Sequence, residues 1–491
     1  MTGSFLIIEM MSVCGFNAAA FDEYETAKLR AFLMQESAEP GIRNYQQIGM
    51  TSMNDINWDD VPGLSWNSLT YTLVRLVWPN MKLSGNLDVS GFESLRDIYC
   101  AFNKINSINV SNCPSLLNID LYTNDLYKID VSTNENLRYL RLGYNNLQTV
   151  DISHNPNLMF LCCTENQVKM LDVSNQASLC TLYCIGNGLH TLLVDNCVAL
   201  ERLLCGQNDL TSLNLNNLPS LETFSSFMNP INDLQLHNCT SLQNLECKMN
   251  ELSDLDVTRC KKLTALDCSS NQLTTMNISG CNQLTSLNCD NNFLSTLDIS
   301  DAPLLAKLSC KNNNLTFLTL PLFKPPLTTY SYSPQQYIDL ECDYNDINLN
   351  AFYKIDNVIS NYNWYYQGTI AYPLVRNEGR FVFDESYIGK TLICRVTNQA
   401  LRLLVMHFDV TFTRDGVSNN IHPKTGKPTV YAGEQTIHIN AETAAAVSIY
   451  SLQGSLQLRQ TVSAGHTSIP IERGIYVVVV NDATSYKVII K

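Results

Sequence analysis

Apolar positions recur along this chain with a fixed period of 21 residues, from Leu95 to about Leu320. In each repeat a large aliphatic or aromatic residue stands eight and five residues before an Asn, and an aliphatic residue stands two residues after it. This residue, here called the ladder Asn, occupies eleven successive positions: Asn103, Asn124, Asn145, Asn166, Asn187, Asn208, Asn229, Asn250, Asn271, Asn292 and Asn313. Such a period predicts a solenoid, in which each repeat forms one coil stacked on the previous coil.

The residues around each ladder Asn follow the pattern L-x-x-L-x-C-x-x-N, whose alternation of apolar and polar positions predicts a short strand. Strands of successive coils should pair in parallel, about 4.8 Å apart, with the apolar columns inside. Because a buried amide without partners costs about 1–3 kcal/mol, we expect the ladder Asn side chains to bond the backbone and connect neighbouring coils. The other residues are too few for a full helix and should form extended segments and turns, giving a gently curved arc.

The consensus L-x-x-L-x-C-x-x-N-x-L-x-x-L-D-V-S-x-C/N resembles the leucine-rich repeat, and its short length is closest to the bacterial internalin-type repeats. The resemblance implies a mostly β solenoid, which we assign to residues 73–350. It begins with an imperfect coil at Leu73 and ends with a coil-like piece at Tyr337–Ile347. Residues 21–72 should form a helical N-terminal cap. An amphipathic helix is expected at Asp22–Glu36. Trp58, Trp66 and Trp78, which follow it, indicate packing more than a binding pocket.

The chain has 18 Cys, and most of them fall into two columns of the repeat. The first column stands three residues before the ladder Asn and accepts Leu as well: Cys100, Cys163, Cys184, Cys205, Cys247, Cys268, Cys289 and Cys310. The second column accepts Asn, Leu or Ala as well: Cys113, Cys197, Cys239, Cys260 and Cys281. A position that accepts Leu is a core position, so we interpret these residues as buried thiols, with disulfides or metal ligands as the alternative.

Two further modules follow the repeats. Residues 351–413 show short alternating strands such as Tyr362-x-Trp364-x-Tyr366, which predict a small β-sandwich. The arrangement W…G-x-x-x-x-C-x-V-x-N resembles bacterial immunoglobulin-like modules, in which Trp364 and Cys394 would pack together in the core. Residues 414–428 are a polar linker.

The last segment, residues 429–491, predicts a second small β-sandwich. Its motifs V-x-I-Y-x-L-x-G, G-I-Y-V-V-x-V and K-V-I-I-K resemble the type A sorting domain of the type IX secretion system of Bacteroidota, with a generic sandwich as the alternative. Residues 1–20 are apolar and end in small residues, which indicates a signal peptide, although Glu9 interrupts them. An ordinary buried N-terminal segment is the alternative. The two signals together imply export to the cell surface or the medium.

Charge and motifs exclude several classes of function. The net charge of −14 disfavours nucleic acids and anionic membranes as partners, and no apolar run after residue 20 is long enough to span a bilayer. The motifs H-E-x-x-H, G-x-S-x-G and a strand-to-helix G-x-G-x-x-G are absent. A repeat column of Asp residues indicates turns, with weak Ca²⁺ binding as the alternative. We therefore expect no catalytic residues, no metal and no cofactor, and an enzyme with an unrecognised site stays the less favoured alternative.

The x positions of the strand motif should point outward, and in the early coils many of them are aromatic. Exposed rings interspersed with Arg are typical of binding hot spots, although cross-strand pairing that only stabilises the sheet would also account for them. The predicted ligand-binding residues are Tyr99, Phe102, Asp120, Tyr122, Tyr139, Arg141, Tyr144, Phe160 and Tyr183. We predict a monomeric, secreted or surface-bound adhesin or interaction scaffold that binds a protein or glycan. The alternative is a carbohydrate-capture protein of an uptake system.

Overall fold

The computed structural model describes residues 21–321, 327–413, 429–433, 436–441, 445–451, 456–462, 465–471, 474–480 and 484–490. The predicted signal peptide (1–20) and linker (414–428) lie outside these residues. The chain divides into two compact units. The first comprises Met1–Asn292, Asp298–Cys310 and Pro321–Ser331, and the second comprises Phe293–Leu297, Lys311–Leu320 and Tyr332–Lys491. Each unit is described by itself below.

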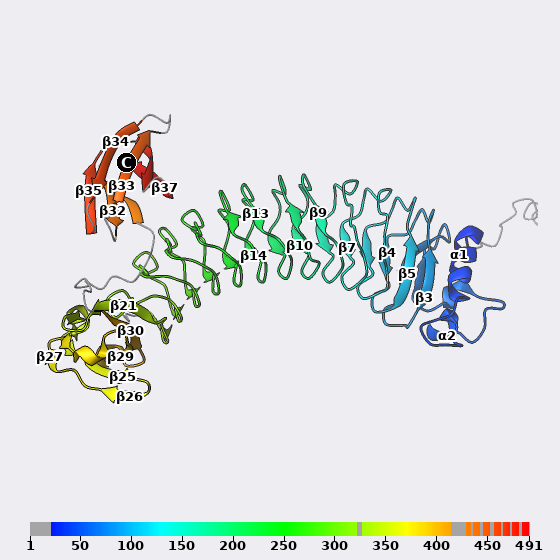
Figure 1. Ribbon diagram of the computed structural model, residues 1–491. Coiled ribbons are helices and arrows are strands. Elements are labelled where there is room, and N and C mark those ends of the chain that lie inside the picture. Colours follow the sequence, from blue (N-terminus) through cyan, green and yellow to red (C-terminus); the bar gives the residue numbers. More distant parts are fainter. Residues whose placement is uncertain are drawn as a thin grey trace, which may run out of the picture. The chain divides into compact units, whose positions relative to one another are not determined.

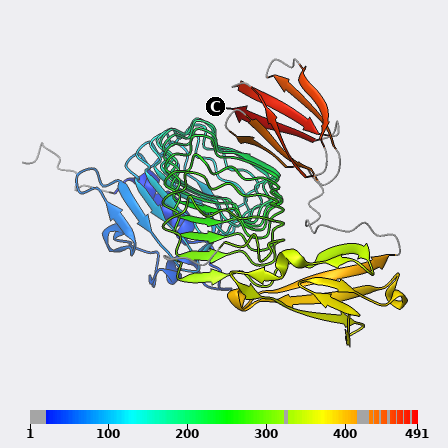
Figure 2. The same cartoon turned by 90° about the vertical axis from the view of Figure 1, so that its left-hand side faces the viewer.

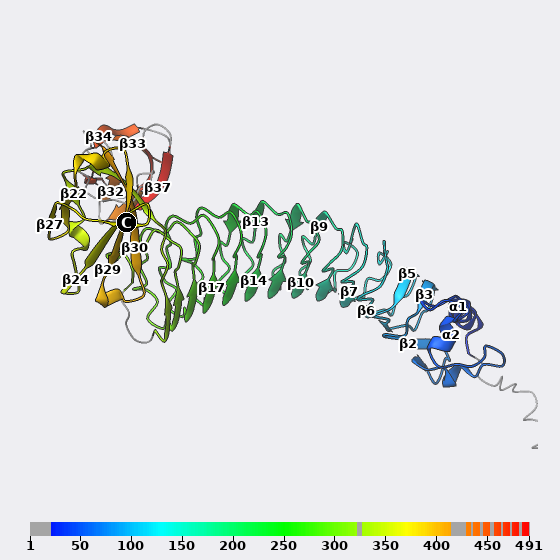
Figure 3. The same cartoon turned by 60° about the horizontal axis from the view of Figure 1, so that its bottom comes forward.

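The first unit is a solenoid whose strands form one 14-stranded sheet, in which each strand contributed by a coil pairs in parallel with the next (Figures 1 and 3). After β1 (Leu64–Trp66), the order of strands is β2 (Leu73–Val77), β4 (Asp97–Tyr99), β6 (Asn118–Asp120), β7 (Tyr139–Arg141), β8 (Phe160–Cys162), β10 (Thr181–Tyr183), β12 (Arg202–Leu204), β14 (Thr223–Ser225), β16 (Asn244–Glu246), β17 (Ala265–Asp267), β18 (Ser286–Asn288), β19 (Lys307–Ser309) and β20 (Thr329–Ser331). The predicted mostly β solenoid is confirmed.

Hydrogen bonds of the ladder Asn side chains connect the coils. Asn145 is typical: its Oδ1 accepts from the N–H of Leu126 at 2.9 Å, and its Nδ2 donates to the carbonyls of Leu121 and Leu142, both at 3.0 Å. Leu121 and Leu126 belong to the previous coil, whereas Leu142 belongs to the coil of Asn145 itself. Each ladder Asn therefore satisfies backbone groups at the end of two strands at once, as the sequence predicts.

Substitution of a ladder Asn should destabilise the solenoid strongly. Asn145→Ala leaves the buried N–H of Leu126 without its partner and removes one of the two amide donors to the carbonyls of Leu121 and Leu142, so we expect the free energy of unfolding to fall by about 3 kcal/mol. The exposed neighbour Asn146 provides the matched control. Urea unfolding followed by circular dichroism should show a change within about 0.5 kcal/mol for Asn146→Ala. Equal losses in the two variants would contradict the role of the ladder.

Both cysteine columns lie inside the coils, and every Cys in the described residues is free. The second column has a further role, because its thiols donate to the carbonyl 24 residues earlier: Cys113 to Val89 and Cys197 to Val173, both at 3.0 Å. Asn155, which fills the same column, donates from Nδ2 to the carbonyl of Val131 at 3.0 Å. Cys and Asn thus alternate here because each supplies a side-chain donor to the same carbonyl of the preceding coil, which also accepts from a backbone N–H.

The side of the coils opposite the large sheet is built from turns and short strand pairs, as Figure 2 shows along the stack. These pairs are β3 (Ser84–Asp88) with β5 (Lys104–Asn109), β9 (Met170–Asp172) with β11 (Thr191–Leu193), and β13 (Ser212–Asn214) with β15 (Asp233–Gln235). No helix occurs between β2 and β20 in the described residues. The expectation of extended segments and turns on this side is therefore confirmed.

A helical cap covers the first coil of the solenoid. It consists of α1 (Glu23–Leu33), α2 (Asn44–Gln47), the 3-10 helix η1 (Trp58–Asp60) and β1, which pairs antiparallel with β2. Asp22 caps α1 by accepting from the N–H of Glu25 at 2.9 Å. Trp78 is fully buried, stacks on Phe32 with ring centroids 5.9 Å apart, and donates from Nε1 to the carbonyl of Pro62. The packing role predicted for the Trp residues is confirmed for Trp78.

The cap contains one buried carboxyl group, that of Glu25, which is 3 % exposed. Its Oε2 accepts from the N–H of Leu73 at 2.6 Å, at the start of β2. Burial raises the pKa of Glu25 to about 7, although the Leu73 bond acts in the opposite direction. The proton is therefore held more tightly in the folded protein than in the unfolded chain.

This pKa predicts that the cap loses stability as the pH rises. A carboxyl whose folded pKa lies above its unfolded pKa contributes stability below the unfolded value of 4.5 and loses it as the pH rises through about 7. The difference in melting temperature between the parent protein and Glu25→Gln should therefore grow from pH 5 to pH 8, with the variant more stable at pH 8. The exposed Glu23→Gln in the same turn should show no such trend in calorimetry.

In the second unit, residues 338–413 form a module of short strands and 3-10 turns. Its five-stranded sheet has the order β21 (Ile338–Asp343), β30 (Val405–Thr413), β29 (Thr391–Thr397), β25 (Asn361–Tyr366) and β26 (Thr369–Ala371). The other elements are β22 (Ile347–Asn348), η2 (Asn350–Phe352), β23 (Lys354–Ile355), β24 (Val358–Ile359), β27 (Val375–Asn377), β28 (Arg380–Val382), η3 (Glu385–Tyr387) and η4 (Gln399–Leu401). Trp364 and Cys394 are buried cross-strand partners on β25 and β29, as expected.

The assignment of Tyr337–Ile347 to a last coil is wrong. β21 pairs with β30 along six residues and so belongs to the sheet of this module. Asn345 stands where a ladder Asn would be, yet it is exposed. Leu340 and Cys342 are buried through the alternation of a strand in a sandwich, which produces the same local spacing as a coil. The last strand of the solenoid sheet is instead β20, which follows a Pro-rich insert and lacks the repeat pattern.

The C-terminal segment also contains two sheets. One has the order β31 (Thr429–Gly433), β32 (Thr436–Ala441) and β35 (Gly465–Pro470), and the other has the order β34 (Leu456–Val462), β33 (Ala445–Ser451), β36 (Gly474–Val480) and β37 (Thr484–Ile490). Their buried side chains form one core: Ile437, Ile439, Val447, Ile449, Val462, Ile469 and Val478. Within the described residues, no helix combines the length and the apolar character needed to cross a bilayer.

Candidate binding surface on the strand-lined face

The outer surface of the 14-stranded sheet, here called the strand face, presents four positions of each coil. They stand six, four, two and one residues before the ladder Asn. The residue directly before the ladder Asn is in the left-handed region in every coil, with φ between 53° and 68°. In this conformation Phe102 and Tyr144 are 49 % and 48 % exposed. Such backbone is strained for residues other than Gly, and the regular hydrogen bonds between the coils maintain it.

The first row of rings on the strand face comprises Phe102, Tyr122 and Tyr144. Their centroids are 5.6 and 5.1 Å apart, in edge-to-face geometry. The guanidinium of Arg141 lies 3.9 Å from the ring centroid of Tyr122 and forms an ion pair with Asp120 at 3.1 Å. Burial acts to lower the pKa of Arg141, but the neighbouring Asp120 carboxylate raises it above its ordinary value. The predicted residues of this row therefore lie together as an aromatic surface with one held cation.

A second row comprises Tyr139 and Phe160, at the starts of β7 and β8, and Tyr183, at the end of β10. Tyr139 and Phe160 are stacked with centroids 4.4 Å apart, and Tyr183 meets Phe160 edge-to-face at 5.6 Å. Tyr99 is not part of either row in the ring contacts of the described residues, and its neighbour is the guanidinium of Arg75 at 5.6 Å. Sequence reasoning missed Arg75, which belongs to the imperfect first coil. All nine predicted residues lie on the strand face, and their role in binding stays a prediction.

A glycine makes room for the ring of Tyr122. A methyl group added at Gly143, in the next coil, would lie 2.8 Å from Cε2 of Tyr122 and 3.3 Å from the sulfur of Cys162. The Tyr122 ring therefore packs against the backbone at Gly143, and Cys162 is buried beside it although its position points toward the strand face. Sequence reasoning missed both Gly143 and Cys162. A Gly in an outward column next to an aromatic residue was the available signal.

Cys162 should report on the position of the Tyr122 ring. Tyr122→Ala removes the group that lies beside the thiol, so we expect Cys162 to react with iodoacetamide at least about tenfold faster than in the parent protein. The adjacent Cys163 points into the coil and is fully buried, so it serves as an internal control that should stay unmodified. Peptide mapping by mass spectrometry measures both. Modification of Cys163 at the same rate would indicate unfolding rather than the loss of a cover.

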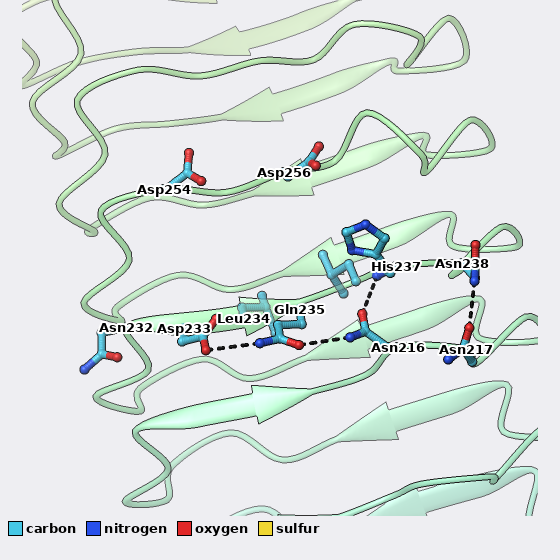
Figure 4. Close-up of a pocket in the computed structure, with 11 residues that line it drawn as sticks. Asn216, Asn217, Asn232, Asp233, Leu234, Gln235, His237, Asn238, Asp254 and Asp256 are labelled. Atoms are coloured by element: carbon cyan, nitrogen blue, oxygen red, sulfur yellow. Dashed lines mark hydrogen bonds between the residues drawn. The ribbon is translucent and has the colours of Figure 1, made fainter. Parts of the chain in front are cut away.

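A shallow polar pocket of about 610 Å³ occurs on the opposite side of the first unit, near β15 (Figure 4). Its amides already bond one another: Gln235 donates to Asp233 and accepts from Asn216, whose own Oδ1 accepts from the N–H of His237. Asp254 and Asp256 lie on the next coil. Because these groups are exposed and mostly satisfied by one another, they do not favour a particular ligand.

The column of Asp residues has a structural role in turns. Oδ1 of Asp130 accepts from the N–H of Ser132 at 2.9 Å, and Asp151 and Asp298 do the same with Ser153 and Ser300. Bonds from these serines lower the pKa of each Asp carboxyl. Within the described residues, no group of three His, Cys, Asp or Glu side chains has the arrangement of a metal site.

Comparisons with known proteins found similar chains among solved structures. No protein-family model and no curated protein matches this chain. Among solved structures, the functional domain of InlJ from Listeria monocytogenes is 20% identical, with a TM-score of 0.45, over 67% of this chain and 90% of that chain. A leucine-rich-repeat protein of Leptospira interrogans is 21% identical, with a TM-score of 0.43, over 53% of this chain and 76% of that chain. YopM from Yersinia enterocolitica is 23% identical, with a TM-score of 0.44, over 52% of this chain and 57% of that chain. Each is a protein to which this chain is similar, and the function must be argued from its own residues.

Proposed function

We propose that the protein is a non-enzymatic interaction scaffold that binds a protein through the strand face of its solenoid. The observation that carries the proposal is the contact among Phe102, Tyr122, Tyr144 and Arg141. Rings that only stabilised the sheet would gain most from full burial, whereas Phe102 and Tyr144 leave about half of their surface in water. Exposed aromatic residues beside a pre-positioned Arg are the side chains that contribute most to protein interfaces.

The rigidity of the solenoid adds to this argument. Because the backbone of each coil bonds to the next, the rings are held at fixed separations and lose little entropy on binding. Arg141 is likewise held by Asp120, so its guanidinium keeps donors for a partner without first having to be ordered. The face is therefore pre-organised, which favours specific binding by a scaffold of this kind.

A glycan is the second candidate, because exposed rings on adjacent coils can stack against sugar rings. We also propose export, directed by residues 1–20 and by the C-terminal module of residues 429–491, and exposure at the cell surface or release. This proposal rests on the sequence resemblance to signal peptides and to sorting domains. The function would then be that of an adhesin or a surface scaffold, with carbohydrate capture as the alternative.

The test compares the full chain with Tyr122→Ala/Tyr144→Ala. Both proteins are immobilised and exposed to a host-tissue extract and, separately, to a glycan array. We expect the parent protein to retain a defined protein, identified by mass spectrometry, and the double variant to lose about 90% or more of that retention, because each ring contributes about 1–2 kcal/mol.

Tyr127→Ala is the matched control, since Tyr127 is 56 % exposed and stands three residues after its ladder Asn, outside the strand face. It should retain the same protein in the same amount. Glycan binding that depends on Tyr122 and Tyr144 would favour the carbohydrate alternative. The proposal would be contradicted if the parent protein, the Tyr122→Ala/Tyr144→Ala variant and the Tyr127→Ala variant all retained the same proteins in the same amounts.

A further inference from the structure

A second apolar cluster lies on the strand face several coils beyond the first. It comprises Phe227, Met228 and Met249, of which Met228 and Met249 are 44 % and 48 % exposed. Both Met residues stand directly before a ladder Asn, with φ of 56°, as do Phe102 and Tyr144 in the early coils. The backbone therefore holds them outward in the same conformation. Sequence reasoning named outward residues only in the early coils and missed this cluster.

The second cluster contains the same kinds of group as the first, although its glycine lies in the preceding coil and not in the following one. The ring of Phe227 packs against Gly206 of the preceding coil. A methyl group added at Gly206 would collide with this ring, just as a methyl group added at Gly143 would collide with the ring of Tyr122. The ammonium of Lys248 lies 5.7 Å from the centroid of Phe227, and Glu246 holds it in an ion pair at 2.5 Å. A ring lying over a glycine, a cation near the ring and a carboxylate on the cation thus occur twice on one face.

The coils between the two clusters present the half-buried apolar side chains of Tyr183, Ile185 and Leu204, beside exposed polar residues that include Glu165, Arg202 and Gln207. Beyond Met249 the same positions become polar: Ser269, Ser270, Ser286 and Asn288. The apolar side chains of the strand face therefore extend from Phe102 to Met249, and the part of the face that they occupy, with the polar residues among them, is here called the strip. At about 4.8 Å per coil, Tyr122 and Phe227 stand about 24 Å apart, and the strip is about 34 Å long.

These dimensions decide which kind of ligand can use both clusters. Five residues of strand are about 17 Å wide, so the strip covers on the order of 600 Å², close to the roughly 800 Å² that one partner contributes to a standard protein interface. A short saccharide cannot span both clusters. The flexible thioethers of Met228 and Met249 adapt to apolar protein surfaces but offer neither a flat ring nor a hydrogen bond to a sugar.

We propose that one folded protein partner contacts both clusters at once, with Phe227 and Met249 forming a second anchor about five coils from the Tyr122 anchor. This inference rests on the proposed function and adds to it the class of the partner and the length of its contact. Because the solenoid is rigid, the partner must present two apolar contacts at the matching separation.

The experiment uses the protein retained by the parent chain and lost by Tyr122→Ala/Tyr144→Ala, purified and measured against full-length variants by biolayer interferometry. Met249→Ser changes an exposed side chain, whereas Phe227→Ala changes a half-buried side chain. If Phe227→Ala fails to fold, Met249→Ser still tests the second anchor. We expect each substitution to weaken binding about tenfold or more. Gly206→Ala should weaken it too, because the added methyl group collides with both the ring and the backbone carbonyl of Phe227.

Matched controls lie outside the strip. Met170 is 57 % exposed on the opposite side of the coils, and Phe293 is 43 % exposed directly after a ladder Asn. Met170→Ser and Phe293→Ala should leave the affinity unchanged. Unchanged affinity in Met249→Ser and Phe227→Ala, together with loss in Tyr122→Ala/Tyr144→Ala, would overturn this inference and leave the proposed function standing. If no protein is retained, or if only a glycan binds, both fall.

Discussion

The structure depends on one interaction, the hydrogen bonding of a buried amide between successive coils. Each ladder Asn satisfies carbonyls in its own coil and in the previous coil, and it accepts from an N–H of the previous coil. A repeat longer or shorter by one residue would move this amide away from its partners and leave buried polar groups unsatisfied. The period of 21 residues is therefore maintained by the cost of a broken polar network at least as much as by the packing of Leu residues.

The same constraint sets the geometry of the binding surface. Because the chain must turn at each ladder Asn, the preceding residue adopts a left-handed conformation in every coil and its side chain points into water where it is large. Phe102, Tyr144, Met228 and Met249 are exposed for this reason. The turn that the buried ladder Asn requires thus places the preceding residue of every coil in one row on the strand face. The side chain at this position makes no core contact, so its identity can vary. In this chain, apolar residues occupy that row at two places on the strand face.

The interior also shows how polar and apolar roles combine. Cys and Asn exchange in the second column because both donate to the carbonyl 24 residues earlier. The Cys side chain has no second polar atom that needs a partner. The Asn side chain has one, and Oδ1 of Asn155 is buried without a partner in the described residues. The interpretation of Cys as a small apolar residue was therefore incomplete. The coil wrongly assigned at Tyr337–Ile347 shows a limit of local motifs. The same spacing of apolar residues occurs in a coil of the solenoid and in a strand of a sandwich, so the motif alone does not distinguish them.

The sequence by itself determined the features that repeat: the parallel strands, the inward and outward columns, the ladder Asn and the burial of the thiols. Periodicity makes these predictable, because one arrangement must satisfy every copy of the motif. Tertiary structure alone decided how the side chains that differ from coil to coil pack. The period already implied that residues 21 apart meet across neighbouring strands, but it did not decide that the rings of Tyr122 and Phe227 turn toward Gly143 and Gly206. The pairing of β21 with β30 joins segments about 70 residues apart. This pairing depends on which distant strands become neighbours, and that is settled only when the whole chain packs.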